Sequence, residues 1–167
     1  MTSSWLRIDN RSMPMRAKAT ANYANSALAR VEAIRAGYDE AIMMNAKGNV
    51  VEGTAENIFI IKDKTVITPP INAGALDGIT RSCILTICDE NNIEYEIRDI
   101  VRDELFVADE VFLSGTAAQI KPIVEIDSRI VADGSVGEMT KKLQTCYEKI
   151  VRGKERKLSE TWLTFIQ

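Results

Sequence analysis

The most suggestive chemistry in the sequence belongs to one lysine, Lys18, which lies between two alanines in the segment Arg16–Tyr23. A lysine normally keeps its ammonium group in water, because an unpaired buried charge is costly. Small apolar neighbours predict a backbone packed closely around the amine, a setting that suits a nucleophile for carbonyl groups. An ordinary exposed lysine near a helix start is the alternative, and the segment alone favours it.

A second candidate is the segment Glu52–Asn57, in which two carboxylates, Glu52 and Glu56, stand four residues apart after a predicted strand. Gly53 and Thr54 allow a tight bend that would aim one carboxylate inward. An inward carboxylate can accept a hydrogen bond from a protonated ring nitrogen and hold its positive charge. A solvated loop between two hairpins is the alternative.

Two further segments could bind an anion. Gly78 begins a predicted helix whose first N–H groups and positive dipole end point outward, and the Thr80 hydroxyl would add a donor. The alternative is a helix start capped by Asp77, whose carboxylate would repel an anion. The small residues of Ser114–Ala118 let backbone amides approach a phosphate or carboxylate, although they also fit a plain turn after a strand.

The composition removes several rival chemistries. The 167 residues contain no histidine, which excludes Ser-His-Asp and Cys-His catalysis and most zinc sites. Cys83, Cys88 and Cys146 form no C-x-x-C pair and indicate buried thiols in a reducing compartment. The net charge of −3 argues against a nucleic-acid surface. With no signal-peptide pattern and no apolar run of the ~20 residues that a membrane span needs, we expect a cytoplasmic protein.

The elements that must position these residues follow from the hydrophobic pattern. Residues 1–17 are expected to be extended. Helices are predicted at 20–36, 78–92, 102–108 and 135–153, and strands at 40–44, 50–54, 57–61, 65–68, 93–100, 110–113 and, as a pair turning at Asp127–Ser128, within 120–132. Strands outnumber helices and mostly join by short turns, which predicts a single α+β domain, residues 1–167, with a mainly antiparallel or mixed sheet. Residues 154–167 form a tail without an assigned role.

Together the candidate segments form a recognisable set. An amine, a tyrosine five residues later (Tyr23), an acidic pair, a helix-start anion site and a second anion-binding turn are the parts of a pyridoxal-phosphate site. In such a site the lysine bonds to the aldehyde, the acid keeps the pyridine nitrogen protonated, and amides hold the phosphate.

In this order the segments resemble those of the branched-chain amino-acid aminotransferases, which belong to the fold-type IV (class IV) pyridoxal-phosphate enzymes. The matching segments are Ala17–Tyr23, Gly37–Ala41, Glu52–Phe59, Thr68–Pro70, Gly78–Arg81 and Ala108–Ala118. The resemblance implies the D-amino-acid-aminotransferase-like large domain, an α+β fold whose mixed or antiparallel sheet closes into a pseudo-barrel with flanking helices. It also implies a smaller N-terminal domain before the region that begins here.

The resemblance implies transfer of an amino group from Leu, Ile or Val to 2-oxoglutarate, with pyridoxal 5'-phosphate as cofactor. Lys18 would hold the cofactor as a Schiff base and move the proton of the substrate α-carbon. Tyr23 would contact the ring's phenolic oxygen, and Glu52 would face the pyridine nitrogen with Glu56 in support. The other implied contacts are Ile79, Thr80 and Thr116 to the phosphate, and Gly115, Thr116 and Ala117 to the substrate carboxylate; no metal is expected.

The chain departs from the family pattern at three positions. Ala21 and Ala55 stand where the family often has glycine, and Asp77 stands at a usual proline position, which would weaken phosphate binding. Without the smaller domain, we expect this chain alone to bind cofactor weakly, to turn over poorly and to form a homo-oligomer through exposed apolar surface. The alternatives are another fold-type IV enzyme (a D-amino-acid aminotransferase or an aminodeoxychorismate lyase) and a non-catalytic oligomerising or binding module.

Overall fold

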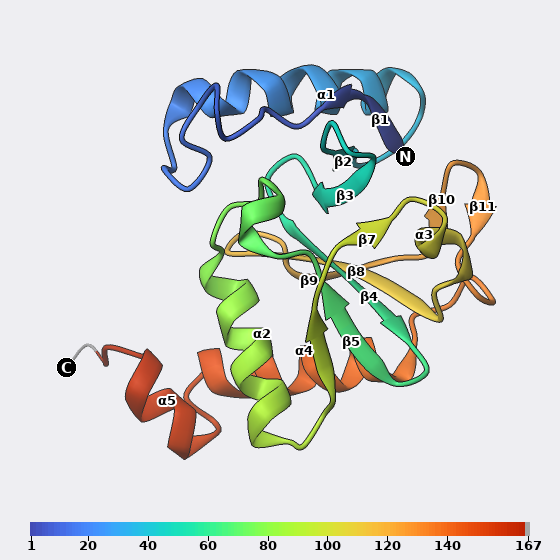
Figure 1. Ribbon diagram of the computed structural model, residues 1–167. Helices are drawn as coiled ribbons and strands as arrows, with labels where there is room; N and C mark the ends of the chain where they lie inside the picture. The colour runs from blue at the N-terminus through green and yellow to red at the C-terminus, as the bar shows by residue number, and fades with distance from the viewer. Residues whose placement is uncertain (166–167) are drawn as a thin grey trace.

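A nine-stranded mixed sheet organises residues 1–165, the part of the chain that the computed structural model describes (Figure 1). Its strands are β1 (Thr2–Leu6), β2 (Ile42–Met44), β3 (Asn49–Glu52), β4 (Asn57–Lys62), β5 (Thr65–Thr68), β6 (Tyr95–Ile97), β7 (Ile100–Val101), β8 (Glu110–Gly115) and β9 (Gln119–Ile123). Strands β1 to β6 follow one another in space, β7 pairs with β3, and β8 joins β4 to β9. The pairs β1–β2 and β5–β6 are parallel and the others antiparallel, so the predicted α+β fold with a mixed sheet is confirmed.

Strand β4 is the centre of the sheet because its apolar run is buried on both faces. Ile58 and Ile60 face one hydrophobic cluster, and Phe59 and Ile61 face the other, as strand alternation requires. Phe59 stacks on Phe112 of β8 with ring centroids 4.8 Å apart. The apolar composition of this strand therefore places it between β5 and β8, where both faces are covered.

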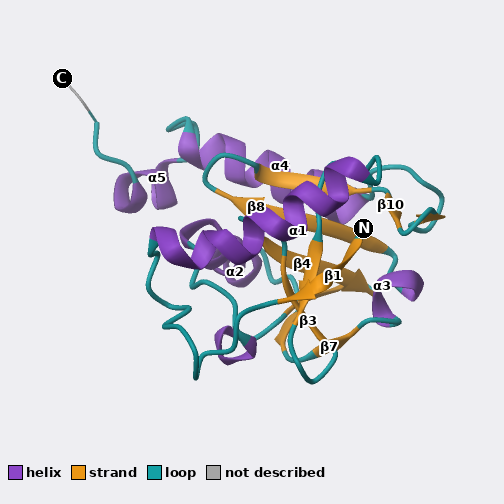
Figure 2. Cartoon of the chain, turned by 90° about the horizontal axis from the view of Figure 1, so that it is seen from above, coloured by secondary structure: helices purple, strands orange, loops and turns teal. Residues whose placement is uncertain are grey.

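Helices cover the sheet on both sides (Figure 2). They are α1 (Tyr23–Arg35), α2 (Ile79–Glu90), α3 (Glu104–Val107), α4 (Glu138–Val151) and α5 (Arg156–Trp162), with short 3-10 helices at Thr20–Asn22 and Ile71–Ala73. Helices α2 and α4 pack on the face of Phe59 and Phe112, while α1 lies over β1 at the top of Figure 1. Among the helices of residues 1–165, none has the length and apolar character that a bilayer span requires.

Helix α1 forms where predicted, but the side chains that it buries differ from its large apolar residues. Leu28, Val31 and Ile34 are exposed, whereas Ala29 and Ala33 are fully buried. The two alanines lie one turn apart, and their small size lets the helix approach Ala41 and Met43 closely. Shape rather than hydrophobicity therefore selects the inner face of this helix.

The predicted strand pair within 120–132 is partly wrong. The first part of that segment is β9, which pairs with β8 through Ser114–Ile120 and Gly115–Gln119. The turn at Asp127–Ser128 is confirmed, but it joins only a two-stranded ribbon, β10 (Glu125–Ile126) and β11 (Arg129–Ile130). Strand β9 joins the main sheet because that pairing buries Ile120.

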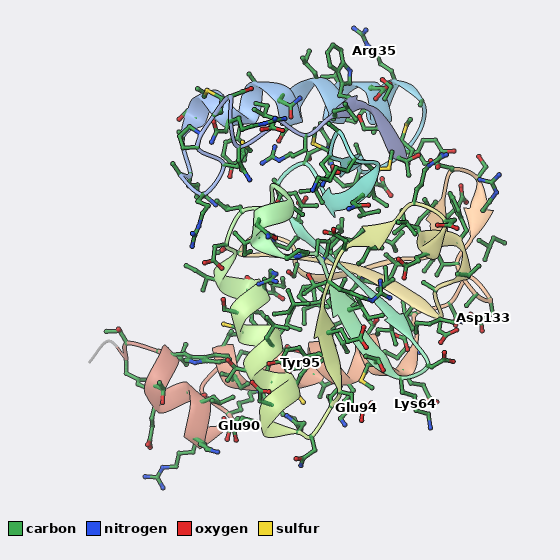
Figure 3. All side chains as sticks on the ribbon, viewed as in Figure 1. Arg35, Lys64, Glu90, Glu94, Tyr95 and Asp133 are labelled. Atoms are coloured by element: carbon green, nitrogen blue, oxygen red, sulfur yellow. The ribbon has the colours of Figure 1, made fainter. Side chains whose placement is uncertain are left out.

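Glutamate carboxylates cap the N-terminal ends of two helices, α4 and α5. Helix α4 begins at Glu138 rather than 135, because Glu110 accepts hydrogen bonds from the backbone N–H groups of Met139 and Thr140. Helix α5 lies in the segment left unassigned by sequence, and Glu155 caps it. Figure 3 shows charged side chains such as Arg35, Lys64 and Asp133 extending outward from the rim of the molecule.

Candidate active site

Lys18 and Glu52 line the same small cavity, between the segment before α1 and the adjoining ends of β3 and β4. Its other lining residues are Arg7, Met15, Ala17, Asn22, Tyr23, Thr54, Ala55, Asn57 and Leu76. The enclosed volume is about 20 Å³, room for roughly one water molecule. The enclosed cavity itself is therefore too small to contain an aromatic ring.

Lys18 itself is exposed, so the expectation of a backbone packed around its amine is wrong. The reason is that the loop is tied from its inner side: the buried Asn22 side chain donates to the carbonyl oxygens of Pro14 (3.2 Å) and Ala17 (2.9 Å). The Ala19 N–H also donates to Ala17 O at 2.8 Å and closes a tight turn. Lys18 is the central residue of this turn, and its side chain points outward. The amine is carried on a held backbone and is free to reach a group at the cavity mouth.

Glu52 points inward and is only 4% exposed, so the solvated-loop alternative does not describe it. Its Oε1 lies 2.7 Å from Arg7 Nη2, and its Oε2 accepts from Leu76 N at 3.0 Å and from Asn57 Nδ2 at 3.3 Å. Burial raises the pKa of the Glu52 carboxyl, while the positive charge of Arg7 and the Leu76 amide oppose that rise. The carboxylate is therefore held by three donors on the cavity wall.

Sequence reasoning missed Arg7, Asn57 and the Leu76 amide. Arg7 is 8% exposed and also donates from Nη1 to Ser26 Oγ of α1 at 2.8 Å. The available signal was the position of Arg7 between two apolar residues, Leu6 and Ile8, since a charge that is buried with such neighbours needs a partner. Its partner could not be named from sequence.

Glu56 does not line the cavity and lies behind the Ala55 turn. Its Oε2 accepts from Ala55 N at 3.1 Å. Burial raises the pKa of Glu56, and the negative charge of the nearby Glu40 acts in the same direction. Glu40 in turn accepts from Thr54 Oγ1 at 2.6 Å and pairs with Arg30. Glu56 and Glu40 therefore form a pair of neighbouring carboxylates beneath the bend that carries Thr54 and Ala55.

The start of α2 has no side-chain cap from any residue of 1–165, so the alternative in which Asp77 caps it is wrong. Gly78 is the N-cap in an extended conformation, and Asp77 is exposed. The first N–H groups of the helix, including those of Ile79 and Thr80, thus have no side-chain acceptor within residues 1–165, although Ile79 is exposed and Thr80 is buried. A Cβ at Gly78 would lie 2.0 Å from Asn57 Oδ1, which joins this helix start to a residue of the Lys18 cavity.

The turn after β8 lies beside the same bend. Ser114 pairs with Asn57 across β4 and β8, and a Cβ at Gly115 would lie 3.4 Å from Glu56 Cγ. Thr116 and Ala117 are exposed. The structure therefore brings the small-residue turn next to the acidic bend, although Gly115, Thr116 and Ala117, like Ile79 and Thr80, do not line the enclosed cavity.

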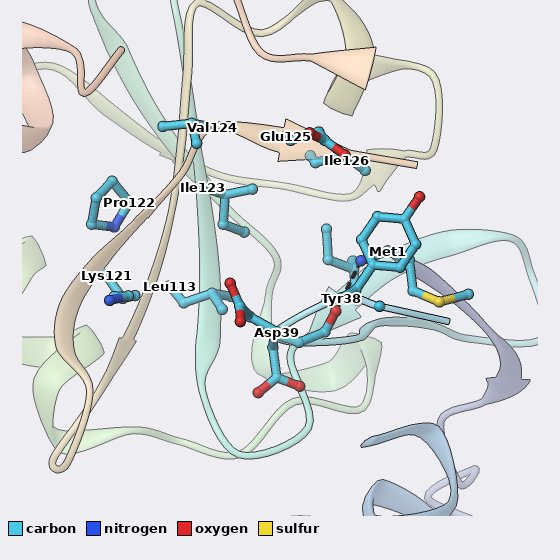
Figure 4. Close-up of a pocket in the computed structure, with 13 residues that line it drawn as sticks. Met1, Tyr38, Asp39, Leu113, Lys121, Pro122, Ile123, Val124, Glu125 and Ile126 are labelled. Carbon is cyan, nitrogen blue, oxygen red and sulfur yellow. Dashed lines mark hydrogen bonds between the residues drawn. The ribbon is translucent and has the colours of Figure 1, made fainter. Parts of the chain in front are cut away.

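A larger cavity of about 320 Å³ is lined by residues 37–40 and residues 121–126, among others (Figure 4). Its walls include Met1 and Tyr38 on one side and Pro122, Ile123 and Val124 on the other. Glu40, which also lines it, reaches Thr54 of the Lys18 cavity. This second cavity is largely apolar and has no helix start on its lining. Within residues 1–165, no three His, Cys, Asp or Glu side chains gather in a way that could hold a metal ion.

Similar proteins share this fold and much of this sequence. The probable branched-chain-amino-acid aminotransferase of Aquifex aeolicus is 51% identical over 97% of this chain. A branched-chain aminotransferase structure from Thermoproteus uzoniensis with norvaline matches 98% of the chain with a TM-score of 0.93 and 48% identity. The branched-chain amino acid aminotransferase of Thermobaculum terrenum, solved in its PLP-form (holo-form), also matches 98% of the chain, with a TM-score of 0.94 and 41% identity.

The matches also fix how much of such a protein the chain represents. It covers 52% of the Aquifex aeolicus relative, 54% of the Thermoproteus uzoniensis chain and 53% of the Thermobaculum terrenum chain, so it spans about half the length of the relatives it matches. The expected D-amino-acid-aminotransferase-like fold is confirmed by these structures. Residues 1–126 match the sequence model of the family "Amino-transferase class IV". The chain therefore belongs to the class IV aminotransferase family.

Proposed function

We propose that residues 1–167 are the cofactor-binding domain of a pyridoxal-phosphate-dependent aminotransferase that transfers the amino group of Leu, Ile or Val to 2-oxoglutarate. The observation that carries this proposal is that Lys18 and the ion-paired Glu52 line one cavity. The names of the similar proteins support the reaction. The norvaline complex of one relative supports the substrate class, and the PLP-form of another supports the cofactor.

The donor set around the cavity suits this cofactor. An outward-reaching amine, an inward carboxylate and an uncapped helix start lie on adjoining elements. In addition, two buried polar atoms of the cavity residues, Arg7 Nε and Asn22 Oδ1, have no hydrogen-bond partner within residues 1–165. Polar atoms without a partner are typical of residues around a site that binds a polar ligand.

Each residue then has a defined task. Pyridoxal phosphate, when bound, supplies a carbonyl carbon that condenses with amines and a ring that withdraws electrons. The Lys18 amine holds it covalently and moves the proton of the substrate α-carbon. The Glu52 carboxylate holds the positive charge of the ring nitrogen, with Glu56 in support, and the Tyr23 hydroxyl donates to the phenolic oxygen.

The phosphate and substrate contacts come from the two flanking segments. The N–H groups of Ile79 and Thr80 at the start of α2, together with Thr116, bind the phosphate. Gly115, Thr116 and Ala117 bind the substrate carboxylate through backbone amides, which small side chains leave accessible. The uncapped helix start and the exposed turn support both assignments.

The same geometry explains why this chain alone should be a poor catalyst. Lys18 is exposed and the enclosed volume is only about 20 Å³, so a ring bound here is open to water on one side. Water weakens the electrostatic contacts that hold and activate the cofactor. We therefore expect weak cofactor retention and slow turnover.

Two wider features complete the proposal. Exposed apolar residues on α1 and β1, namely Trp5, Leu6, Leu28, Val31 and Ile34, support a homo-oligomer. The three cysteines are free thiols, which supports a cytoplasmic location.

The function is tested by the half-reaction of the chain with excess pyridoxal phosphate and L-leucine, followed by assay of the 2-oxo acid. We expect slow formation of 4-methyl-2-oxopentanoate from L-leucine, little from D-leucine, and only the background rate of free cofactor for Lys18→Ala. A preference for D-leucine would favour a D-amino-acid aminotransferase. Equal rates for the native chain and Lys18→Ala would favour a non-catalytic module.

A further inference from the structure

The buried pair of Arg7 and Glu52 has a geometry that a purely structural ion pair does not need. An ionised carboxylate offers about four acceptor positions. Three of those on Glu52 are taken, one on Oε1 by Arg7 and two on Oε2 by Leu76 N and Asn57 Nδ2. One acceptor position on Oε1 is therefore left, and Glu52 lies on the wall of the cavity that Lys18 lines.

The orientation of Arg7 is set independently of Glu52. The guanidinium group divides its donors, with Nη2 on Glu52 Oε1 at 2.7 Å and Nη1 on Ser26 Oγ at 2.8 Å. Because the guanidinium is planar, the bond to Ser26 on α1 fixes the direction from which Nη2 approaches. The contact to Glu52 therefore uses one Nη2 donor, which leaves the second position on Oε1 unused.

The pair also favours the ionised form of Glu52, because the charge of Arg7 opposes the rise in the Glu52 pKa that burial causes. Both side chains are almost fully buried, with exposures of 6% and 5%, and burial disfavours the ionised carboxyl. The other charged groups near Glu52 do not substitute for Arg7: Glu56 is negative, and Lys18 is exposed at the cavity mouth. Arg7 is thus the one buried cation on the lining of this cavity within residues 1–165.

We infer that Arg7 is a positioning residue that keeps Glu52 ionised and leaves the last acceptor position of Oε1 free for a cationic ring nitrogen. This role rests on the proposed function only in its final clause, the identity of the group that Glu52 receives. Arg7 favours a Glu52 carboxylate facing a protonated ring nitrogen over a neutral carboxyl facing a neutral ring nitrogen, two arrangements that hold the same single proton. A lysine in place of Arg7 would keep the positive charge but would lack the planar guanidinium, whose N–H donors point in fixed directions.

The first part of the test needs no cofactor. Chain labelled with ¹³C at the glutamate carboxyl is titrated by NMR, and the Glu52 signal is identified by its loss in Glu52→Gln. In Arg7→Gln we expect the midpoint of that titration to move to higher pH. The matched control is Arg11→Gln, because Arg11 pairs with Asp9 at 2.9 Å in the same segment but in solvent. A midpoint in Arg7→Gln equal to that in Arg11→Gln would overturn the inference.

A second measurement covers the case in which Arg7→Gln does not fold. Removing one partner of a buried ion pair leaves an uncompensated charge, whereas removing both does not. We therefore expect Arg7→Gln/Glu52→Gln to melt at a higher temperature than Arg7→Gln. A double variant as unstable as the single one would mean that Arg7 is needed only for packing, and the inference would be wrong.

The third measurement separates this inference from the proposed function. Native chain, Arg7→Lys and, where it folds, Arg7→Gln are incubated with pyridoxal phosphate, and the absorbance of the lysine-bound cofactor is followed against pH. We expect the midpoint of that spectral change to lie at higher pH in Arg7→Gln than in Arg7→Lys or the native chain. If no variant binds the cofactor, the proposed function fails while the carboxylate titration still decides the role of Arg7.

Discussion

The Asn57 side chain lies directly against the Cα of Gly78. A Cβ added there would be 2.0 Å from Asn57 Oδ1 and 3.2 Å from its Cγ. The Nδ2 of the same amide donates to Glu52 Oε2 and to Leu76 O, at 3.3 and 2.8 Å. One side chain thus connects the buried carboxylate, the segment before α2 and the start of that helix, and it requires glycine at the helix start.

We predict that Gly78→Ala destabilises the chain by about 1–3 kcal/mol, because the new methyl group displaces Asn57 from a packed position. The backbone of Gly78 is extended, with φ of −77°, so alanine is not strained there and the cost is steric. Urea unfolding measures it. The control is an Asn57→Ala background, in which the same change should cost much less; equal costs in both backgrounds would contradict this explanation.

We predict that Asn22→Asp loosens the loop that carries Lys18. Aspartate keeps the shape of asparagine but loses the Nδ2 donor that holds Pro14 O and Ala17 O, and it places a charge in a buried position. A loss of roughly 1–3 kcal/mol in unfolding free energy, with faster amide exchange near Lys18, is expected. Asn25→Asp is the control, because Asn25 donates to Leu6 O near the surface. Equal effects of the two variants would argue against a special role for Asn22.

The neighbouring carboxylates Glu56 and Glu40 predict that the free energy of unfolding depends on pH. Burial and the charge of Glu40 raise the pKa of Glu56 above its ordinary value of 4.5, so the ionised form destabilises the folded state. That penalty is present above the raised pKa, falls as pH drops through it, and is gone below 4.5. Glu56→Gln should therefore be more stable than the native chain at pH 7–8, with the difference vanishing near pH 4.

Thermal unfolding from pH 4 to pH 8 measures this difference, with Glu94→Gln as a control, since Glu94 is exposed. A stability gain for Glu56→Gln that is the same at every pH would mean that its charge is not the cause.

Self-association should depend on the outer side of α1. Leu28 and Ile34 are 49% and 58% exposed, so Leu28→Lys/Ile34→Lys should keep the fold and lower the oligomer fraction in sedimentation velocity. Ile130→Lys is the control, because Ile130 is 65% exposed on the separate β10–β11 ribbon. If the control variant dissociates equally, or the α1 variant not at all, the interface lies elsewhere.

The sequence predicted those parts of the fold that depend on local pattern. The hairpins β2–β3 and β4–β5, helix α2 and the turn at Asp127–Ser128 follow from periodicity and turn residues within short windows. Local pattern did not predict that β9 pairs with β8, or which face of α1 is buried. Both depend on which surfaces meet in three dimensions.

The candidate site shows the same division. Residue type and spacing made Glu52 and the start of α2 candidates, and the resemblance to the aminotransferases, rather than the spacing, assigned them to the site. The exposure of Lys18 agrees with the alternative that its segment alone favours, whereas the hydrogen bond from Asn22 that holds the backbone beside it could not be predicted. Arg7 was missed because its two partners, Ser26 and Glu52, come from elements distant in sequence.

The central claim, that Lys18 is the amine that bonds to the cofactor beside Glu52, is tested most directly by reductive trapping. The native chain is incubated with pyridoxal phosphate, reduced with borohydride and digested, and adducts are assigned to each lysine by mass spectrometry, with Lys18→Ala and Glu52→Gln in parallel. We predict that the Lys18 peptide carries most of the adduct, that Lys18→Ala loses it, and that Glu52→Gln lowers its share. Adduct spread evenly over exposed lysines such as Lys47 and Lys64, and unchanged in Glu52→Gln, would contradict the claim.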